Sequence, residues 1–321
     1  MLNSDTARSV IDHALYMGAD FAELFIEKSQ TNNIATLSDQ VQSVQSGIDF
    51  GIGLRIAYGP KVLYGFTNDT GREELKRIAT DLTTKDRRDP QTTAKSFDYC
   101  RATEHHPASR TISKDAEVAD KVTYLLAADR AARSTENLIS HTKGYCLQRE
   151  QAIEVFNSEG LHIEDTRHYT RAGLTAIAAG DGEQATGTCN DGGLKGWELV
   201  DEIDAETTGN EAARQAMINL EAQPCPSGRM PVVIGPGFGG VIFHEACGHL
   251  LETTSVAKKA SVFHDKMDEM IAHPTLSAVD DGTLANEWGS INIDDEGMTT
   301  QRLSLIHISE PTRRTPISYA V

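Results

Sequence analysis

Short segments that alternate apolar and polar residues constrain the fold of this chain more than any other feature. Such a two-residue period is typical of β-strands that bury one face, and Gly, Pro, Asn and Asp separate the segments as turn formers do. Because the segments come in groups of consecutive strands, with helices only before, between and after the groups, we predict an α+β fold with antiparallel strands and not a βαβ array. The predicted strands are residues 22–28, 33–37, 41–45, 51–58, 62–66, 138–149, 153–157, 161–165 and 168–179.

Helix-like segments flank these strand groups. An apolar stripe from Ala7 to Leu15 predicts the first helix, with Ser4 or Asp5 as its N-cap and Gly18 at its end. The polar stretch 85–113, which contains two prolines, predicts a long surface loop. Apolar residues at helical spacing predict three further helices at residues 72–82, 115–133 and 211–222.

The stretch PVVIGPGFGGVIFHEACGHLLE, residues 231–252, runs from a predicted apolar strand at 230–234 through a glycine-rich turn into a helix. Its glycine spacing has neither the GK[ST] of a P-loop nor the GxGxxG of a dinucleotide site, so it does not predict nucleotide binding. A helix that begins close against a sheet explains the glycines instead.

His244, Glu245 and His249 lie on this helix in the order HExxxH. Residues four apart lie about 40° apart around an α-helix, whereas residues five apart lie about 140° apart. A regular helix therefore does not present both histidines to one metal ion. A local π-turn, bonded from residue i to i+5, would bring them together, and Gly248 weakens the regular helix at this point.

Two interpretations of these side chains stay open at this level. They are ordinary surface or capping residues, or they are ionisable residues that line a cleft. The apolar neighbours, residues 241–243 and 250–251, favour the cleft. Cys247 lies within the motif, but a single cysteine on a packed helix is better explained as a small core residue than as a ligand.

The acidic composition limits the classes of partner. A net charge of −17 and a pI near 5.0 provide no basic field for direct nucleic-acid binding. Five scattered cysteines without a CxxC pair predict neither a disulfide framework nor a Cys-only zinc site. No apolar run is long enough to span a bilayer, and the N-terminus lacks a signal-peptide pattern, so we expect a cytoplasmic protein that does not enter the membrane.

At the motif helix the sequence resembles the TldD/PmbA family, since HEACGHLLE is similar to the HExxxH helix of TldD-type subunits. The resemblance extends over nearly all of residues 5–301. It includes the segments GADFAELFIEK, GIDFGIGLR, YGFTND, VFNSEG, SGRMPVVIGPG, VDDGTL and GSINIDDEG.

The resemblance implies a zinc-dependent peptidase that acts on unfolded or small peptides together with a PmbA/TldE-like partner subunit. By motif position, His244 and His249 are the implied Zn²⁺ ligands, and Glu245 is the implied catalytic carboxylate that moves the proton of an attacking water. Glu252 lies on nearly the same face, where it either orients a histidine or is an ordinary helix-end carboxylate. The family has also been labelled a modulator of DNA gyrase. Because the chain is strongly acidic, we expect any effect on gyrase to be indirect.

The resemblance ends near Gln301, whereas the family continues to a distant cysteine that is its third metal ligand. The final segment, RLSLIHISEPTRRTPISYAV, resembles a translated sequencing adapter, so His307 is not assigned as a ligand. We therefore predict an N-terminal α+β region at 1–220, the truncated start of a sheet-rich metallopeptidase domain with the HExxxH helix at 221–301, and a non-native tail at 302–321. The alternatives to an active peptidase are a non-catalytic interaction subunit or an inactive truncated fragment.

Overall fold

The computed structural model describes residues 2–84, 88–89, 94–103, 106, 117–236 and 238–306. The chain divides into two compact units. The first contains Met1–Ala222 together with Ala285–Thr299, and the second contains Gln223–Leu284 together with Thr300–Val321. The domain boundaries predicted at residues 220 and 301 stay predictions.

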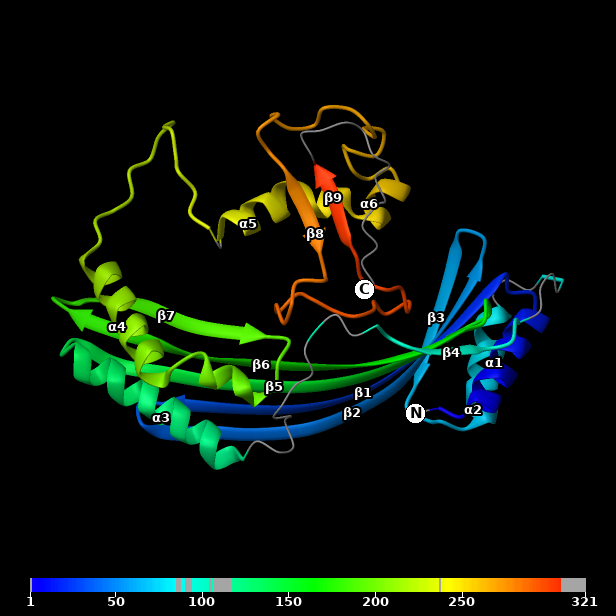
Figure 1. The fold of residues 1–321 in the computed structure, drawn as a ribbon, viewed down its shortest axis with the longest axis horizontal. Coiled ribbons are helices and arrows are strands. Elements are labelled where there is room, and N and C mark those ends of the chain that lie inside the picture. Colours follow the sequence, from blue (N-terminus) through cyan, green and yellow to red (C-terminus); the bar gives the residue numbers. More distant parts are fainter. Residues whose placement is uncertain are drawn as a thin grey trace. The chain divides into compact units, whose positions relative to one another are not determined.

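A seven-stranded sheet forms the centre of the first unit (Figure 1). Its strand order is β3-β2-β1-β5-β6-β4, with β7 also paired to β6. All neighbours are antiparallel except β4 and β6, which confirms the predicted α+β class. The strands are β1 (Phe21–Leu37), β2 (Gln40–Tyr58), β3 (Lys61–Thr67), β4 (Asp98–Arg101), β5 (Ile139–Asn157), β6 (Leu161–Gly180) and β7 (Glu183–Gly193).

The strands are longer than their sequence patterns predict. The segments predicted at 22–28 and 33–37 are one continuous strand, β1, and the same merging occurs in β2, β5 and β6. The polar residues between the predicted segments stay in the ladder because β1 pairs along its length with both β2 and β5. Hydrogen bonds from two neighbouring strands outweigh the weak strand propensity of such residues. Strands β4 and β7 were not predicted, and β4 lies within the expected loop 85–113, much of which falls outside the described residues.

Helices cover one face of the sheet in two pairs (Figure 1). Helices α1 (Ser4–Tyr16) and α2 (Arg72–Thr83) pack on the part of the sheet that contains Leu24, Leu54 and Phe156. Helices α3 (Val118–Thr135) and α4 (Ala205–Glu221) pack through alanines on Leu174 and its neighbours in β6, and the 3₁₀-helix η1 (Trp197–Asp201) precedes α4.

At the two ends of α1, the predicted N-cap is wrong and the predicted helix end is confirmed. Asn3, and not Ser4 or Asp5, is the N-cap, since its side-chain oxygen accepts hydrogen bonds from the N–H groups of Asp5 and Thr6. The predicted end at Gly18 is confirmed: this residue has a φ of +98°, a conformation that glycine adopts without steric cost.

The opposite face of the sheet binds the segment Ala285–Thr299, which we call the return segment. Ile293 is fully buried against Ile153 and Val155. Arg55 forms two ion pairs: one with Glu23 of β1 at 3.1 Å and one with Glu296 of the return segment at 2.5 Å. These apolar and ionic contacts attach a distant part of the chain to the sheet of the first unit.

The second unit has less regular structure. It contains α5 (Phe238–Phe243), a π-helical turn η2 (His244–Gly248), a 3₁₀ turn η3 (His249–Leu251), α6 (Thr253–Ala257), and an antiparallel pair of β8 (Ala278–Asp281) and β9 (Arg302–Ile306). The strand predicted at 230–234 is wrong: these residues lie in no helix or strand, and Val233 is 101% exposed. Its apolar sequence has no partner strand among the described residues, and a strand without a ladder is not formed.

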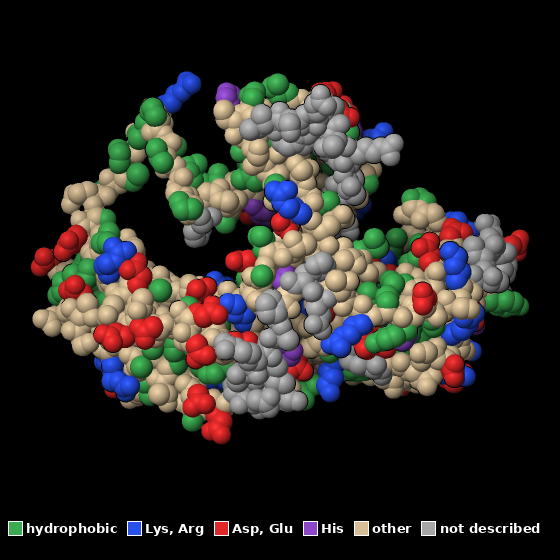
Figure 2. All heavy atoms as spheres, in the orientation of Figure 1, with side chains coloured by type: hydrophobic (Ala, Val, Ile, Leu, Met, Phe, Trp, Pro, Cys, Tyr) green, Lys and Arg blue, Asp and Glu red, His purple; other side chains and the backbone are tan. Residues whose placement is uncertain are grey.

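The predicted tail begins within β9, while its remainder, including His307, lies outside the described residues. Among the helices that the structure describes, none combines the length and apolar character needed to cross a membrane. On the face shown in Figure 2, the Lys and Arg side chains that are described lie in small groups among acidic ones and form no extended basic surface.

Candidate metal centre

The motif residues occupy a helical segment that changes its hydrogen-bond pattern at the histidines. Helix α5 passes directly into the π-helical turn η2, and the N–H of His249 bonds to the carbonyl oxygen of His244. This is the i to i+5 bond of a π-turn, the local change that the sequence indicates could bring the two histidines together. The wider turn compensates for the extra residue between the two histidines, because it rotates His249 back toward the side of His244.

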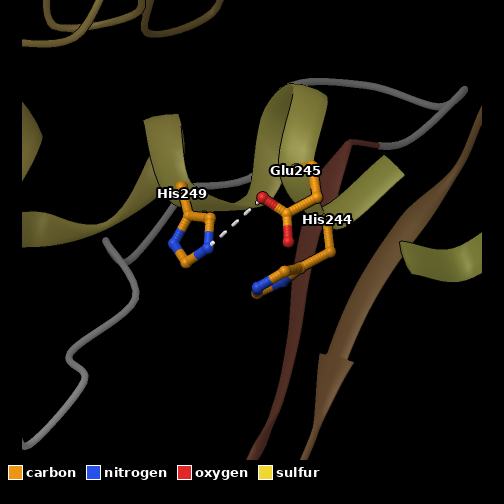
Figure 3. Close-up of side chains that lie close together, drawn as sticks. All are labelled: His244, Glu245 and His249. Carbon is orange, nitrogen blue, oxygen red and sulfur yellow. Dashed lines mark ion pairs between the residues drawn. The ribbon is translucent and has the colours of Figure 1, made fainter. Parts of the chain in front are cut away.

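The three motif side chains converge on one side of this segment (Figure 3). The imidazole centroids of His244 and His249 are 4.3 Å apart. One ligand atom from each of His244, Glu245 and His249 lies within 4.8 Å of the other two. In the part of the chain that the structure describes, these residues are the one group of three or more potential metal ligands at such distances.

Gly248 allows the close approach of the first histidine. A Cβ atom on Gly248 would lie 2.9 Å from Nδ1 of His244, which is closer than ordinary side-chain contacts allow. The sequence predicted only that this glycine weakens the helix. Its second role, space for the imidazole ring, becomes visible once the π-turn places residue 248 beside residue 244.

Glu252 forms a hydrogen bond with the second histidine, through the ring nitrogen that does not face the cluster. Its Oε1 atom lies 2.6 Å from Nδ1 of His249, and its side chain is 22% exposed. With the Nδ1 proton donated to this carboxylate, Nε2 of His249 carries the free lone pair. That nitrogen faces the cluster, where it lies 3.9 Å from Oε2 of Glu245.

The donor atoms suit a zinc ion chemically. Two imidazole nitrogens and a carboxylate are ligand types that Zn²⁺ accepts, and a carboxylate behind a ligating histidine is a common support in such sites. The side chains of Glu245 and His249 are 67% and 53% exposed, so each can contact a metal ion or a substrate without displacing a packed neighbour. The residues present therefore fit the metal that the motif implies.

Cys247 takes no part in this cluster. It lines an apolar hollow of about 470 Å³ together with Ile242, Phe243 and Leu276. The glycine-rich turn before α5 also lines this hollow. A Cβ on Gly235 or Gly240 would meet no atom within 4 Å, whereas a Cβ on Gly239 would lie 2.8 Å from the side chain of Ile234.

Models of three successive family domains match this chain. Domain 1 of the PmbA/TldA metallopeptidases matches residues 22–82, the central domain matches residues 112–220, and the C-terminal domain matches residues 227–307. The last match contains the whole HExxxH segment.

Curated relatives carry the same family name. The metalloprotease TldD homolog of Haemophilus influenzae is 28% identical over 94% of this chain and 64% of its own length. A metalloprotease of Methanothermobacter thermautotrophicus is 29% identical over 89% of this chain and 62% of its own length. The chain therefore spans a little under two thirds of the length of these relatives.

Solved structures share the fold. A candidate modulator of DNA gyrase from Bacteroides thetaiotaomicron superposes with a TM-score of 0.78 and 17% identity, over 95% of this chain and 70% of that one. TldE from Thermococcus kodakarensis superposes with a TM-score of 0.74 and 15% identity, over 98% of this chain and 70% of that one. Because the three matching models are successive domains of one family and the curated relatives are named metalloproteases of that family, this chain belongs to the TldD/PmbA family.

Proposed function

We propose that this protein is a zinc-dependent peptidase that cleaves unfolded or small peptides. The observation that carries the proposal is the convergence of His244, Glu245 and His249 through a π-helical turn. A surface helix has no evident need for such a turn, whereas a metal centre needs both imidazoles on one side. The family names of the curated relatives support the same class of activity.

Each motif residue has a separate role in this proposal. His244 and His249 hold the metal through their imidazole nitrogens. A bound Zn²⁺ supplies Lewis acidity, which polarises the scissile carbonyl and lowers the pKa of water. The carboxylate of Glu245 accepts the proton of the attacking water and passes it to the departing amine, so one side chain acts first as base and then as acid.

Glu252 is a positioning residue in this mechanism. Its 2.6 Å hydrogen bond fixes the tautomer and orientation of the His249 ring, and its negative charge makes the ring a stronger donor toward the metal. It has no direct contact with the reacting atoms in this proposal.

The proposals for the partner and the location rest on the family and not on the site. We propose that the protein works with a PmbA/TldE-like subunit in the cytoplasm, and that it has no direct contact with nucleic acid. The shared fold of TldE from Thermococcus kodakarensis and the net charge of −17 support these proposals.

Metal retention is the first test. The purified chain should retain zinc after dialysis, as measured by elemental analysis, and His249→Ala should lose it. His273→Ala is a matched control, because His273 is an exposed histidine of the same unit outside the motif. Equal zinc content in the two variants would contradict the assigned ligands.

A peptide-cleavage assay distinguishes a loss of catalysis from a loss of metal binding. Glu245→Gln should keep its zinc and lower cleavage of an unfolded peptide, in the presence of the TldE-like subunit, by about 10²- to 10⁴-fold. A Glu245→Gln variant that cleaves at the original rate would exclude this carboxylate as the general base. A native protein that binds no zinc would instead favour a non-catalytic interaction subunit or an inactive fragment that lacks the third ligand.

A further inference from the structure

The face of the seven-stranded sheet opposite the helices carries two arginines on adjacent strands (Figure 1). Ile153 of β5 packs with Ile293 of the return segment on this face, and side chains alternate along a strand, so the odd-numbered residues of β5 share it. In the ladder with β6, Arg149 lies opposite Tyr169, and Arg171 follows two residues later. Arg149 and Arg171 are therefore diagonal neighbours on the same face.

A tryptophan of the return segment lies over these strands. The centroid of a Trp288 ring is 5.5 Å from the guanidinium carbon of Arg171 and 5.4 Å from the centroid of the Tyr169 ring. The indole also lies directly on the backbone of β7, since a Cβ on Gly192 would come within 2.9 Å of it. Although these contacts hold Trp288, it is 40% exposed. It thus offers apolar surface to a ligand in a defined position.

Uncharged groups hold the guanidinium of Arg171. Its Nη2 and Nε atoms donate hydrogen bonds to Oδ1 of Asn190, at 2.8 and 3.3 Å. Burial raises the pKa of the neighbouring Tyr145 hydroxyl, while the charge of Arg171 and its hydrogen bond to this hydroxyl act in the opposite direction. In the part of the chain that the structure describes, no carboxylate forms an ion pair with Arg171. Asn190 leaves further N–H donors of this group for a ligand.

The neighbouring arginines differ from Arg171 in this respect. The chain has 47 acidic and 30 basic residues, so carboxylates are abundant. On the same face, Arg149 pairs with Glu27 at 2.8 Å, and Arg167 pairs with Asp295 at 3.1 Å. Protein carboxylates thus compensate these two charges and leave the charge of Arg171 for a negative ligand.

We propose that this surface binds an acidic side chain of an extended peptide substrate. We call it the arginine platform and define it as Tyr145, Arg149, Tyr169, Arg171 and Trp288. Arg171 forms an ion pair with the carboxylate of the peptide, and the exposed ring of Trp288 packs on apolar atoms beside it. Arginine, tyrosine and tryptophan contribute most of the binding energy at many interfaces. The inference rests on the proposed peptidase function and adds a preference for acidic peptides to it.

The surface suits an acidic side chain better than two other anions. Sites for a C-terminal carboxylate use unpaired backbone N–H groups. At the platform, β5 pairs with β1 and β6, and β6 pairs with β5 and β7, so their backbone groups are used in the ladders. RNA carries many negative charges, which the net charge of −17 opposes, whereas one carboxylate matches one uncompensated guanidinium.

Peptide binding tests the inference without cleavage. The probe is a short fluorescent peptide with one central Glu, uncharged neighbours and an amidated C-terminus, and the matched peptide has Gln in place of Glu. In buffer with EDTA, fluorescence anisotropy should give a dissociation constant about 10- to 100-fold lower for the Glu peptide. Since the net charge of −17 repels acidic peptides, such a preference reports a local positive site.

Variants of the chain locate the site. Arg171→Gln should remove the preference, so that both peptides bind equally. Arg171→Lys keeps the charge without the planar fork and should retain only part of the preference. Arg214→Gln is the matched control, because Arg214 lies on α4 and pairs with Glu211, so this variant should keep the full preference. Circular dichroism verifies that each variant is folded.

Several outcomes overturn the inference. Equal binding of the two peptides by the native chain does so without any variant, and so does a preference that folded Arg171→Gln leaves unchanged. A Gln peptide with a free C-terminus that binds as tightly as the Glu peptide excludes the assigned side chain, and displacement of the Glu peptide by single-stranded RNA points to nucleic acid instead. Because EDTA is present, binding does not depend on zinc. A zinc peptidase indifferent to the charge of the peptide would contradict this inference alone, whereas a chain that prefers the Glu peptide but binds no zinc would contradict only the proposed function.

Discussion

The candidate metal centre depends on the backbone at single residues as much as on its proposed ligands. His244 and His249 are one residue too far apart for a regular helix, and the π-turn between them corrects the spacing. Gly248 makes that correction compatible with the His244 ring, and Glu252 fixes the ring of His249. A change at either supporting residue should therefore affect metal binding without removing a ligand.

Gly248→Ala should weaken zinc binding. Its methyl group would lie 2.9 Å from His244 Nδ1, so the imidazole must move away from the shared position, and we expect an affinity loss of about 10- to 100-fold, the effect of disturbing ligand support in other metal sites. Zinc titration by calorimetry measures this change. Gly240→Ala is the control, since a Cβ there meets no atom within 4 Å. Equal affinities of the two variants would show that residue 248 need not be glycine.

Glu23 makes the stability of the first unit depend on pH. Burial raises the pKa of its carboxyl from 4.5 to about 7, because the loss of hydration outweighs the attraction of Arg55, and Glu296 and Asp294 add repulsion. The folded state therefore binds a proton that the unfolded state releases near pH 4.5. The free energy of unfolding should fall as the pH rises from about 4.5 to 7, by about 3 kcal/mol in total.

Glu23→Gln should remove this part of the pH dependence, since the amide has the shape of the carboxyl without its charge. Urea unfolding at pH 5 and pH 8 should show a smaller difference between the two conditions for this variant than for the native chain. Glu27→Gln controls for loss of a carboxylate from the same strand, where Glu27 pairs with Arg149 at 2.8 Å. The same fall in stability for native protein and Glu23→Gln would exclude Glu23 as its source.

The helices show how one side chain can set the start of an element. Asp204 is the N-cap of α4, and its carboxylate accepts hydrogen bonds from both the N–H and the hydroxyl of Thr207, at 2.7 and 2.8 Å. These bonds hold the pKa of Asp204 below its usual value. Helix α3 begins differently, because its N-cap, Glu117, makes no side-chain capping bond.

Asp204→Ala should destabilise the first unit by about 1 kcal/mol through loss of this cap. Glu117→Ala, at the uncapped start of α3, should change stability much less. Chemical denaturation followed by far-UV circular dichroism compares the two. If both variants lose the same stability, the capping bonds of Asp204 contribute nothing specific to α4.

At the scale of the whole molecule, the chain leaves the first unit after α4 and returns to it at residue 285. The connection that leaves, residues 222–236, has no helix or strand and is exposed throughout, with hydrophobic side chains along it (Figure 2). The return segment, by contrast, is attached through Ile293, Arg55 and Glu296. We therefore expect proteases to cleave the exposed connection more readily than the return segment.

Brief trypsin treatment should cut first after Arg229, which is exposed within the unstructured connection. The two products should elute together in size exclusion, because the return segment holds its part of the chain on the sheet. Replacement of Ile293 by Ala, which removes a fully buried side chain at a cost of about 2–5 kcal/mol, should promote their separation. Immediate dissociation of the native products would show that the return segment does not hold them.

The sequence by itself determined the local features of this protein. The stripe on α1, the end at Gly18 and the need for a π-turn between His244 and His249 all follow from residue spacing and backbone geometry, which act within a few residues. The family resemblance added the implied roles of those residues. Tertiary structure decided the rest: polar residues continue the long strands because neighbours on both sides bond them, while the apolar segment 230–234 forms no strand because none of the described strands pairs with it. Pairing and burial join residues far apart in the chain, so the docking of the return segment and the contact of Gly248 with His244 become visible only in the folded molecule.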